Sequence, residues 1–240
     1  MSPTLSLRRT WTLLVLPPII FLLVIIAASV YFGVLSQGDA QAIADNTQSA
    51  TPYLLAIVQL ILLWQVFRAL KKDSLTWRDA GWSLQPGQSL TREILLGAGI
   101  GVILGVLYVT FLSPLHTWLQ TTFGDYVPPE SLLTSLGSVV LPFFIANVLL
   151  APFVEEALYR GYTLPRLVTR FGPGVGIGIN CLFFGLLHWA GGFWYILLTG
   201  IVAGGAFAAL YQWRRTVLTP FAAHLALNIV EFLFVWLVVG

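Results

Sequence analysis

The chain has 240 residues and is too apolar to fold as a soluble globule. Hydrophobic residues make up 58% of it and charged residues 9%, and the mean hydropathy is +0.86, so too little polar surface remains to cover a water-soluble fold. The net charge of +2 is small and the basic residues form short clusters between apolar runs, which argues against nucleic acid as the partner. The single cysteine, Cys181, excludes an internal disulfide.

Seven apolar runs of membrane-spanning length follow one another along the chain. They cover residues 11–35, 53–70, 94–112, 136–158, 174–189, 194–213 and 217–239. Because a helix needs about 20 apolar residues to cross the hydrocarbon, we predict an all-α, polytopic transmembrane bundle of about seven helices, with six to eight possible. Residues 1–240 are expected to form a single integral membrane domain. The first run is longer than the apolar core of a signal peptide, roughly 7 to 15 residues, so we predict a retained first helix.

The basic residues predict how the bundle is oriented. Segments 36–51 and 113–135 contain no Lys or Arg but hold Asp39, Asp45, Asp125 and Glu130. All twelve Lys and Arg fall on the other side of the alternating runs: Arg8, Arg9, Arg68, Lys71, Lys72, Arg78, Arg92, Arg160, Arg166, Arg170, Arg214 and Arg215. Since cytoplasmic loops collect basic residues, we predict a cytoplasmic N-terminus and an outside C-terminus. The compact chain suggests a bacterial cytoplasmic membrane.

Two sets of glycines and one loop predict packing rather than chemistry. Gly97, Gly101 and Gly105 repeat at four-residue spacing, as do Gly200 and Gly204, and this spacing lets helix backbones approach closely. The segment 71–92 is expected to lie on the membrane surface, and we assign it no chemistry.

The first candidate site combines two adjacent acids with an arginine. Ionisable residues inside apolar segments are costly and usually face a cavity or a partner. At about 100° per residue, Glu156 and Arg160 share a helix face, which predicts an ion pair, whereas Glu155 points away and is free to face a cavity, with Tyr159 one turn below it. Pro152 is expected to begin a new helical piece whose first turn carries both acids. The alternative is that both acids cap a helix at the headgroup level.

The second candidate is a histidine preceded by a phenylalanine. Phe184 lies one turn before His188 on the same face, where its ring can pack against the imidazole. A lone histidine in a membrane helix more often joins helices through a hydrogen bond than acts as a catalyst. Cys181 lies two turns before His188, about 10.8 Å along a straight helix, so a thiol nucleophile paired with this histidine is not expected.

The third candidate is a histidine and an amide on the last helix. His224 and Asn228 are four residues apart and point into one space, where they could bind a developing oxyanion, ligate a metal or join two helices. Glu231 falls near the same face, and we expect it to support the pair or to contact another helix rather than to act directly.

These three clusters together resemble one family. The patterns Glu155-Glu156-x-x-x-Arg160, Phe184-x-x-x-His188 and His224-x-x-x-Asn228 match, in order, the three motifs of the CPBP family, which comprises type II CAAX prenyl endopeptidases and bacteriocin-processing enzymes and is also called Abi. The resemblance covers about residues 137–228, which would carry the catalytic core. It implies an intramembrane glutamate-type endopeptidase that acts on a membrane-associated peptide or protein within the lipid bilayer. Glu155 would activate water, and His188 would assist it. The oxyanion hole would be formed by His224 and Asn228. Supporting roles would fall to Glu156, Arg160 and Phe184.

Two other functions stay open at this point. One is a zinc-type metallopeptidase that uses His188, His224 and a carboxylate, a ligand set that suits zinc, although the sequence contains no His-Glu-x-x-His motif. The other is a membrane protein, such as an immunity protein, that binds a peptide without cleaving it. The leading hypothesis is the glutamate-type endopeptidase. It needs no cofactor, and it predicts a cavity that opens to the cytoplasmic side of the membrane.

A depth estimate conflicts with the implied mechanism. At 1.5 Å per residue, Glu155 falls near the cytoplasmic face while His188 falls roughly 20 Å deeper. For the two to meet, the sequence would need a break at Pro152, a Gly-rich segment 172–178 outside the hydrocarbon, or a strongly tilted helix.

Overall fold

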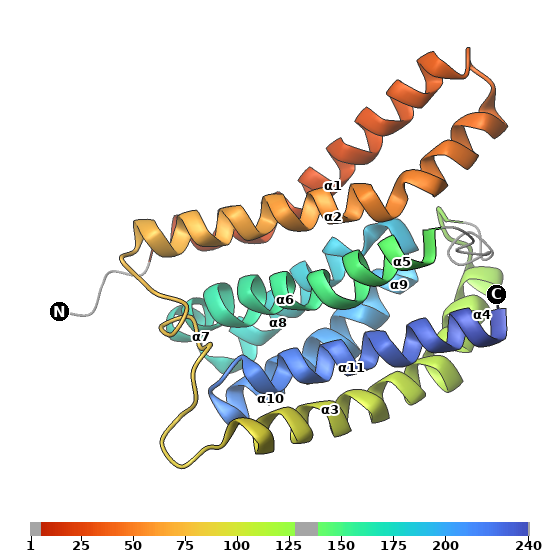
Figure 1. Ribbon diagram of the computed structural model, residues 1–240. Helices are drawn as coiled ribbons and strands as arrows, with labels where there is room; N and C mark the ends of the chain where they lie inside the picture. The colour runs from red at the N-terminus through yellow and green to blue at the C-terminus, as the bar shows by residue number, and fades with distance from the viewer. Residues whose placement is uncertain (1–5, 128–138, 240) are drawn as a thin grey trace.

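The computed structural model describes residues 6–127 and 139–239, and these ranges are helical with no strand. Six helices are long and apolar enough to cross a membrane: Leu7–Leu35, Ala40–Lys72, Leu90–Phe123, Val140–Phe171, Phe193–Arg214 and Leu218–Leu237. A seventh apolar helix, Pro173–Leu187, is shorter. The predicted all-α transmembrane bundle is confirmed (Figure 1).

Most of the spanning helices consist of several segments, because short π-helical turns interrupt them. The first two are α1 (Leu7–Leu35) and α2 (Ala40–Lys72), and the third joins α3 (Leu90–Leu107), η1 (Tyr108–Leu112) and α4 (Ser113–Phe123). The fourth joins α5 (Val140–Phe143), η3 (Phe144–Leu150), α6 (Ala151–Glu156), η4 (Ala157–Thr163) and α7 (Leu164–Phe171). After these come α8 (Pro173–Leu187), η5 (Trp189–Gly191), α9 (Phe193–Leu198), η6 (Thr199–Gly204), α10 (Gly205–Arg214), α11 (Leu218–Phe234) and η7 (Val235–Val239).

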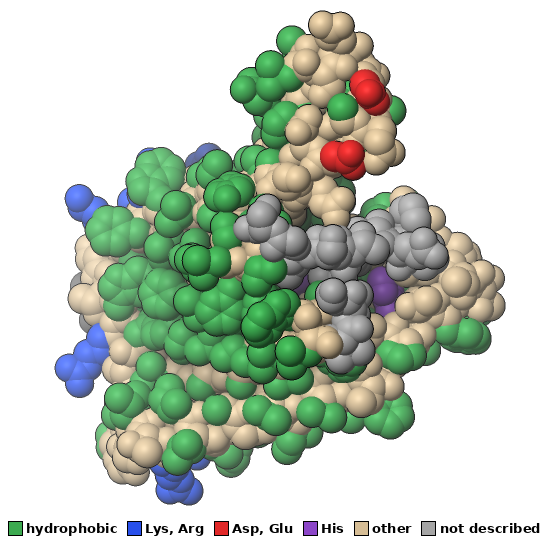
Figure 2. All heavy atoms as spheres, turned by 45° about the vertical axis from the view of Figure 1, so that its right-hand side comes forward, with side chains coloured by type: hydrophobic (Ala, Val, Ile, Leu, Met, Phe, Trp, Pro, Cys, Tyr) green, Lys and Arg blue, Asp and Glu red, His purple; other side chains and the backbone are tan. Residues whose placement is uncertain are grey.

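The first two helices form a hairpin whose far part extends beyond the other helices (Figure 1). Segment 36–51 lies between two of the predicted apolar runs, but helix α2 begins within it, at Ala40. Asp39 explains the early start, since its Oδ1 accepts the backbone N–H groups of Gln41 at 3.0 Å and Ala42 at 3.3 Å and so caps the helix. The exposed Asp39 and Asp45 place acidic side chains on the tip of the hairpin, as Figure 2 shows.

The ends of the helices confirm that the basic residues gather on one side. The start of α1, the end of α2, the start of α3, helix α7 and the end of α10 lie at one end of the bundle, which we call the basic end (Figure 1). These segments and the loops beside them carry every Lys and Arg except Arg160, which is fully buried inside the bundle. The clustering supports the predicted orientation, which itself stays a prediction.

The glycine pattern in α3 has the role that its spacing predicts. Helices α3 and α11 pack closely, and a Cβ on Gly101 would overlap the backbone carbonyl of Ala223. At the basic end of the same helix pair, Arg214 Nε donates to Glu93 Oε2 at 2.9 Å and Thr219 Oγ1 donates to the same oxygen at 2.7 Å. These contacts fix α11, which carries the third motif, against α3.

Candidate active site

The helix that carries the two adjacent glutamates is longer than its apolar run predicts. It continues from Val140 through Pro152 to Phe171, so the expectation that Pro152 begins a new helical piece is wrong. The π-helical turn η3 ends just before Pro152, and wider turns of this kind let a helix absorb a residue that lacks an N–H. Glu155 and Glu156 therefore lie inside a continuous helix and not at a helix N-terminus.

This continuous helix removes the conflict in depth. Phe171, at the basic end, lies sixteen residues beyond Glu155, or about 24 Å along the helix. Helix α8 starts at Pro173 beside it and ends at Leu187, so His188 lies about 22 Å from the same end. Glu155 and His188 thus occupy the same middle layer of the bundle, and the estimate that placed Glu155 near one face is wrong.

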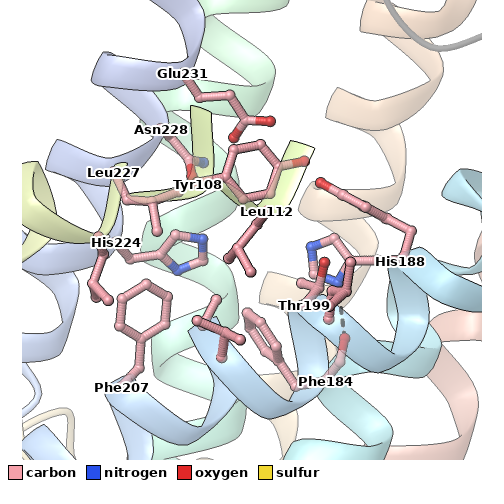
Figure 3. Close-up of a pocket in the computed structure, with 15 residues that line it drawn as sticks. Tyr108, Leu112, Phe184, His188, Thr199, Phe207, His224, Leu227, Asn228 and Glu231 are labelled. Carbon is pink, nitrogen blue, oxygen red and sulfur yellow. Dashed lines mark hydrogen bonds between the residues drawn. The ribbon is translucent and has the colours of Figure 1, made fainter. Parts of the chain in front are cut away.

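Both motif histidines line a pocket in that layer (Figure 3). The pocket is small, with a volume of about 40 Å³, and its polar lining includes His188, His224, Asn228 and Glu231. Glu155 does not line it. Along α11 the lining runs from His224 to Glu231, away from the basic end, so the expectation that the cavity opens toward that end is not supported.

The predicted ion pair between Glu156 and Arg160 is present and fully buried. Arg160 Nη1 lies 2.9 Å from Glu156 Oε1, and both side chains have zero exposure. Arg160 Nη2 also donates to the carbonyl of Gly204 at 3.0 Å, and its guanidinium lies 4.4 Å from the centre of the Phe184 ring. The pair therefore ties the fourth spanning helix to α8 and η6.

The ring of Phe184 brings the three motifs together. Its centre lies 5.0 Å from the centre of the His188 ring, as predicted, and 5.9 Å from that of His224 on α11. The Tyr159 ring, from the first motif segment, lies 5.2 Å away on another side. Tyr159, one turn from Glu155 as expected, is completely buried, and its hydroxyl donates to the carbonyl of Phe183 at 3.1 Å.

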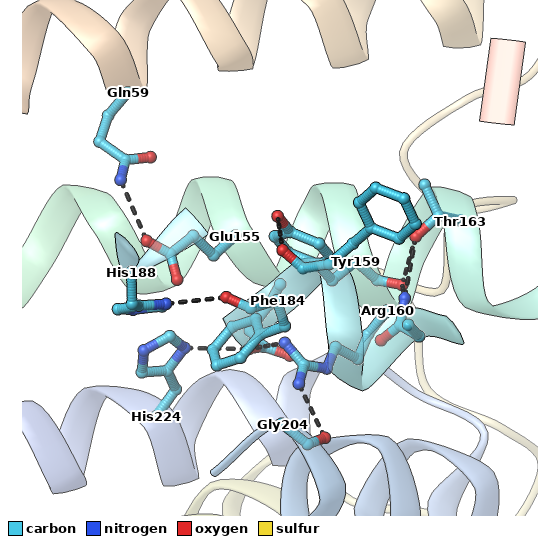
Figure 4. A network of polar contacts seen from close by, with 12 residues as sticks. Gln59, Glu155, Tyr159, Arg160, Thr163, Phe184, His188, Gly204 and His224 are labelled. Carbon is cyan, nitrogen blue, oxygen red and sulfur yellow. Dashed lines mark hydrogen bonds and ion pairs between the residues drawn. The ribbon is translucent and has the colours of Figure 1, made fainter. Parts of the chain in front are cut away.

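Glu155 points toward α2, away from Arg160 (Figure 4). The amide of Gln59 donates from Nε2 to Glu155 Oε1 at 3.0 Å, while Glu155 Oε2 is buried and has no hydrogen-bond partner among the described residues. A buried polar atom without a partner marks a place where a water or substrate group would be stabilised. Gln59 was missed because it lies outside the motif region and does not ionise, although an amide inside an apolar run is itself a signal.

The hydrogen bonds of the two histidines assign their protons. His188 Nδ1 lies 2.8 Å from the carbonyl oxygen of Phe184, which can only accept, so Nδ1 carries a proton. No described residue forms a hydrogen bond with Nε2, which is an acceptor when the ring is neutral. His224 Nδ1 lies 2.9 Å from Glu156 Oε1, so this nitrogen donates to the carboxylate. Asn228 donates from Nδ2 to the carbonyl of Asn147 at 2.9 Å, which uses one of its two N–H groups.

Two further polar contacts that the sequence did not predict hold this arrangement. Asn180 Nδ2 lies 3.0 Å from both the carbonyl of Tyr159 and the hydroxyl of Thr163, which joins α8 to the π-helical turn η4. After His188, the loop that follows α4 holds the start of α9, since Asp125 accepts the N–H of Phe193 at 2.9 Å. Burial opposes ionisation of Asp125, but backbone N–H groups, including that of Phe193, outweigh it and lower the pKa of this carboxyl.

The described residues do not form the ligand set of the zinc alternative. In residues 6–127 and 139–239, no three His, Cys, Asp or Glu side chains are placed to hold one metal ion. Glu156 lies beside His224, but no third group completes a site with them.

Comparisons with known proteins point to one family. The chain matches no curated protein and no solved structure. The family model described as type II CAAX prenyl endopeptidase Rce1-like matches residues 137–230, a range that contains all three motifs. The spanning helices and this match together make the chain an integral membrane protein. Residues 137–230 of the chain are thus similar to the Rce1-like type II CAAX prenyl endopeptidases.

Proposed function

We propose that this protein is an intramembrane endopeptidase of the glutamate type, which hydrolyses a peptide bond in a membrane-associated peptide or protein. The observation that carries the proposal is the meeting of three motif segments around Phe184, with two uncommitted acceptors in one layer of the bundle. These acceptors are Glu155 Oε2 and His188 Nε2. A water molecule can donate one hydrogen to each of them, which directs its lone pair toward a third point where a carbonyl carbon can lie.

In the proposed reaction, the oxygen of this water attacks the carbonyl carbon of the scissile bond. Its proton passes to Glu155, a tetrahedral oxyanion forms, and the same proton is then delivered to the nitrogen as the carbon–nitrogen bond breaks. A positioned general base of this kind contributes about 10²- to 10⁴-fold to the rate. The Gln59 amide holds one oxygen of Glu155 and leaves the other for the water.

His224 and Asn228 suit the stabilisation of the oxyanion. Asn228 has one N–H left after its bond to the carbonyl of Asn147, and His224 lines the pocket while Glu156 holds its Nδ1. Donors fixed in advance in a low-dielectric site stabilise developing charge without reorganising during the reaction. The buried Arg160 and Glu156 would act as positioning residues, since they orient the His224 ring.

The remaining features of the proposal follow from the sequence. We propose one integral membrane domain, with residues 137–228 as the catalytic core, in a bacterial cytoplasmic membrane with the N-terminus on the cytoplasmic side. We propose no cofactor. The zinc alternative has no ligand set among the described residues, and the peptide-binding alternative does not account for two free acceptors in the same layer as two candidate oxyanion donors.

Cleavage of a membrane-tethered peptide tests the proposal. The purified protein in lipid nanodiscs is mixed with tethered peptides that carry or lack a prenyl group, and products are identified by mass spectrometry. Cleavage is expected for the wild type and is expected to be lost in Glu155→Ala and His188→Ala. His116→Ala is the matched control, since His116 is the remaining histidine and lies outside the motifs. Full activity in both motif variants would overturn the proposal, and tight peptide binding without any cleavage would favour the peptide-binding alternative.

A further inference from the structure

The pocket contains an acidic residue that the proposed reaction does not use. Glu231 lies seven residues after His224 on α11, which places it two turns, or about 10 Å, farther from the basic end. Figure 3 shows its carboxylate beside Tyr108 at the edge of the pocket, apart from His224 and Phe207. Both Glu231 and His224 line the same open space.

Glu231 has no basic partner among the residues that the structure describes. All twelve Lys and Arg belong to the described residues, and none of them forms an ion pair with Glu231. Two buried acids of the bundle interior differ, because Glu156 is paired with Arg160 and Glu93 with Arg214, whereas Glu155 resembles Glu231 in having a neutral partner, the Gln59 amide. The polar neighbour of Glu231 is the neutral hydroxyl of Tyr108. A carboxylate inside a membrane protein without a counter-ion is costly, and such residues commonly bind a substrate or an ion.

The walls around Glu231 suit a cation on an apolar stem. Tyr108 and Tyr195 contribute aromatic rings, whose faces attract ammonium and guanidinium groups. Leu104, Leu112 and Leu198 line the same pocket and can cover a methylene chain. A Lys or Arg side chain, or a free amino terminus, combines these two properties.

We propose that Glu231 forms a subsite that recognises a Lys, an Arg or a free amine of the peptide substrate. This inference rests on the proposed endopeptidase function and names the substrate class for the same pocket. Because an extended chain spans about 3.3 Å per residue, the 10 Å between His224 and Glu231 places the cation about three residues from the scissile bond. The cation lies on the side of that bond that points away from the basic end.

A selectivity measurement tests this subsite. A set of membrane-tethered peptides carries Lys, Gln or Glu at each position near the cleavage site, and kcat/KM is measured for each peptide. The wild type is expected to prefer Lys over Gln at one position. Glu231→Gln is expected to lower that preference by about tenfold or more, because it removes the charge and keeps the shape, and Glu231→Lys is expected to shift the preference to Glu.

Asp45→Asn is the matched control for this measurement. Asp45 is an exposed carboxylate on the tip of the hairpin, so its removal changes the charge at the same end of the molecule without altering the pocket. The Lys preference is expected to be unchanged in this variant. If Asp45→Asn lowered the preference for Lys as much as Glu231→Gln does, the preference would come from long-range attraction, and the subsite would be overturned.

A binding measurement separates failure of the subsite from failure of the endopeptidase. The thermal unfolding of the protein is recorded with n-butylammonium and with uncharged n-butanol. The ammonium is expected to raise the unfolding temperature of the wild type more than the alcohol does, and this difference is expected to vanish in Glu231→Gln. If no peptide is cleaved but the difference is seen, the endopeptidase is wrong and the cation subsite stands. If peptides are cleaved with the same Lys preference by wild type and Glu231→Gln, the subsite is wrong and the endopeptidase stands. If the wild type shows neither a Lys preference nor an ammonium effect, the subsite is wrong whether or not the variants fold.

Discussion

The two adjacent glutamates are expected to respond in opposite ways to the same substitution. In Glu155→Gln the new side chain still offers an oxygen to the Gln59 amide, which donates at 3.0 Å in the wild type, so the free energy of unfolding is expected to change by no more than about 1 kcal/mol. The general base is lost, and kcat is expected to fall by about 10²- to 10⁴-fold. In Glu156→Gln the fully buried Arg160 loses its counter-ion, and breaking a buried pair in this way costs about 3–5 kcal/mol of stability.

Denaturant unfolding in detergent micelles and cleavage of a tethered peptide measure both effects on the same preparations. The double variant Glu156→Met with Arg160→Met is the control, because replacing both partners by apolar side chains removes the unpaired charge. This variant is expected to recover the stability of the protein. Its activity is not expected to recover, since His224 loses its acceptor. If Glu155→Gln destabilised the protein as much as Glu156→Gln, or if it kept full activity, the division of roles between the two residues would be wrong.

Three further predictions test the packing, the network at the basic end and the cofactor. Gly185→Ala places a Cβ against the carbonyl of Ile196 and is expected to cost about 1–3 kcal/mol of stability and most of the activity. Gly178→Ala on the same helix is the control, because its Cβ would meet no other atom. Equal effects of the two substitutions would refute the close approach of α8 and α9. Burial opposes ionisation of Asp73, but Tyr162, Arg9 and Arg166 outweigh it and lower the pKa of this carboxyl. The stability that ionised Asp73 contributes is therefore complete above the unfolded-state pKa near 3.8 and is lost as the pH falls through the lower folded-state pKa. Unfolding temperatures measured from pH 6 to pH 2 are expected to show this loss in the wild type and not in Asp73→Asn, and the same pH dependence in both would contradict it. Treatment with a chelator is expected to leave peptide cleavage unchanged, and a loss that zinc restores would revive the metallopeptidase alternative.

The contacts that the sequence predicts correctly are local ones. Glu156 with Arg160 and Phe184 with His188 are each four residues apart, so the pitch of a helix places them together wherever the helix lies. The membrane bundle follows from composition in the same direct way, because apolar runs of this length require lipid. Neither inference needs to know which helices are neighbours.

The contacts that the sequence does not predict join distant segments. Gln59 meets Glu155 across 96 positions of the chain, and Asn228 meets Asn147 across 81. Neutral amides give no charge signal, and helical periodicity does not show which helices are packed together. The roles of Tyr108 and Glu231 in one pocket depend in the same way on the packing of α3 against α11.

The error in the depth of Glu155 has a definite physical cause. Arg160 and Arg166 interrupt the apolar run after Leu158, and charged residues in such a position normally mark the end of a membrane helix. Here the two guanidinium groups are buried, since Arg160 pairs with Glu156 and Arg166 with Asp73, so the helix continues to Phe171. The ion pair between Glu156 and Arg160, which supports His224, is therefore also the reason why hydropathy does not predict where the fourth spanning helix ends. Because the helix continues, Glu155 lies in the middle of the bundle. The short helix α8 ends in the same layer, so His188 lies there too. The proposed base and its proposed partner histidine can then lie in one layer, away from the basic end, without a broken or strongly tilted helix.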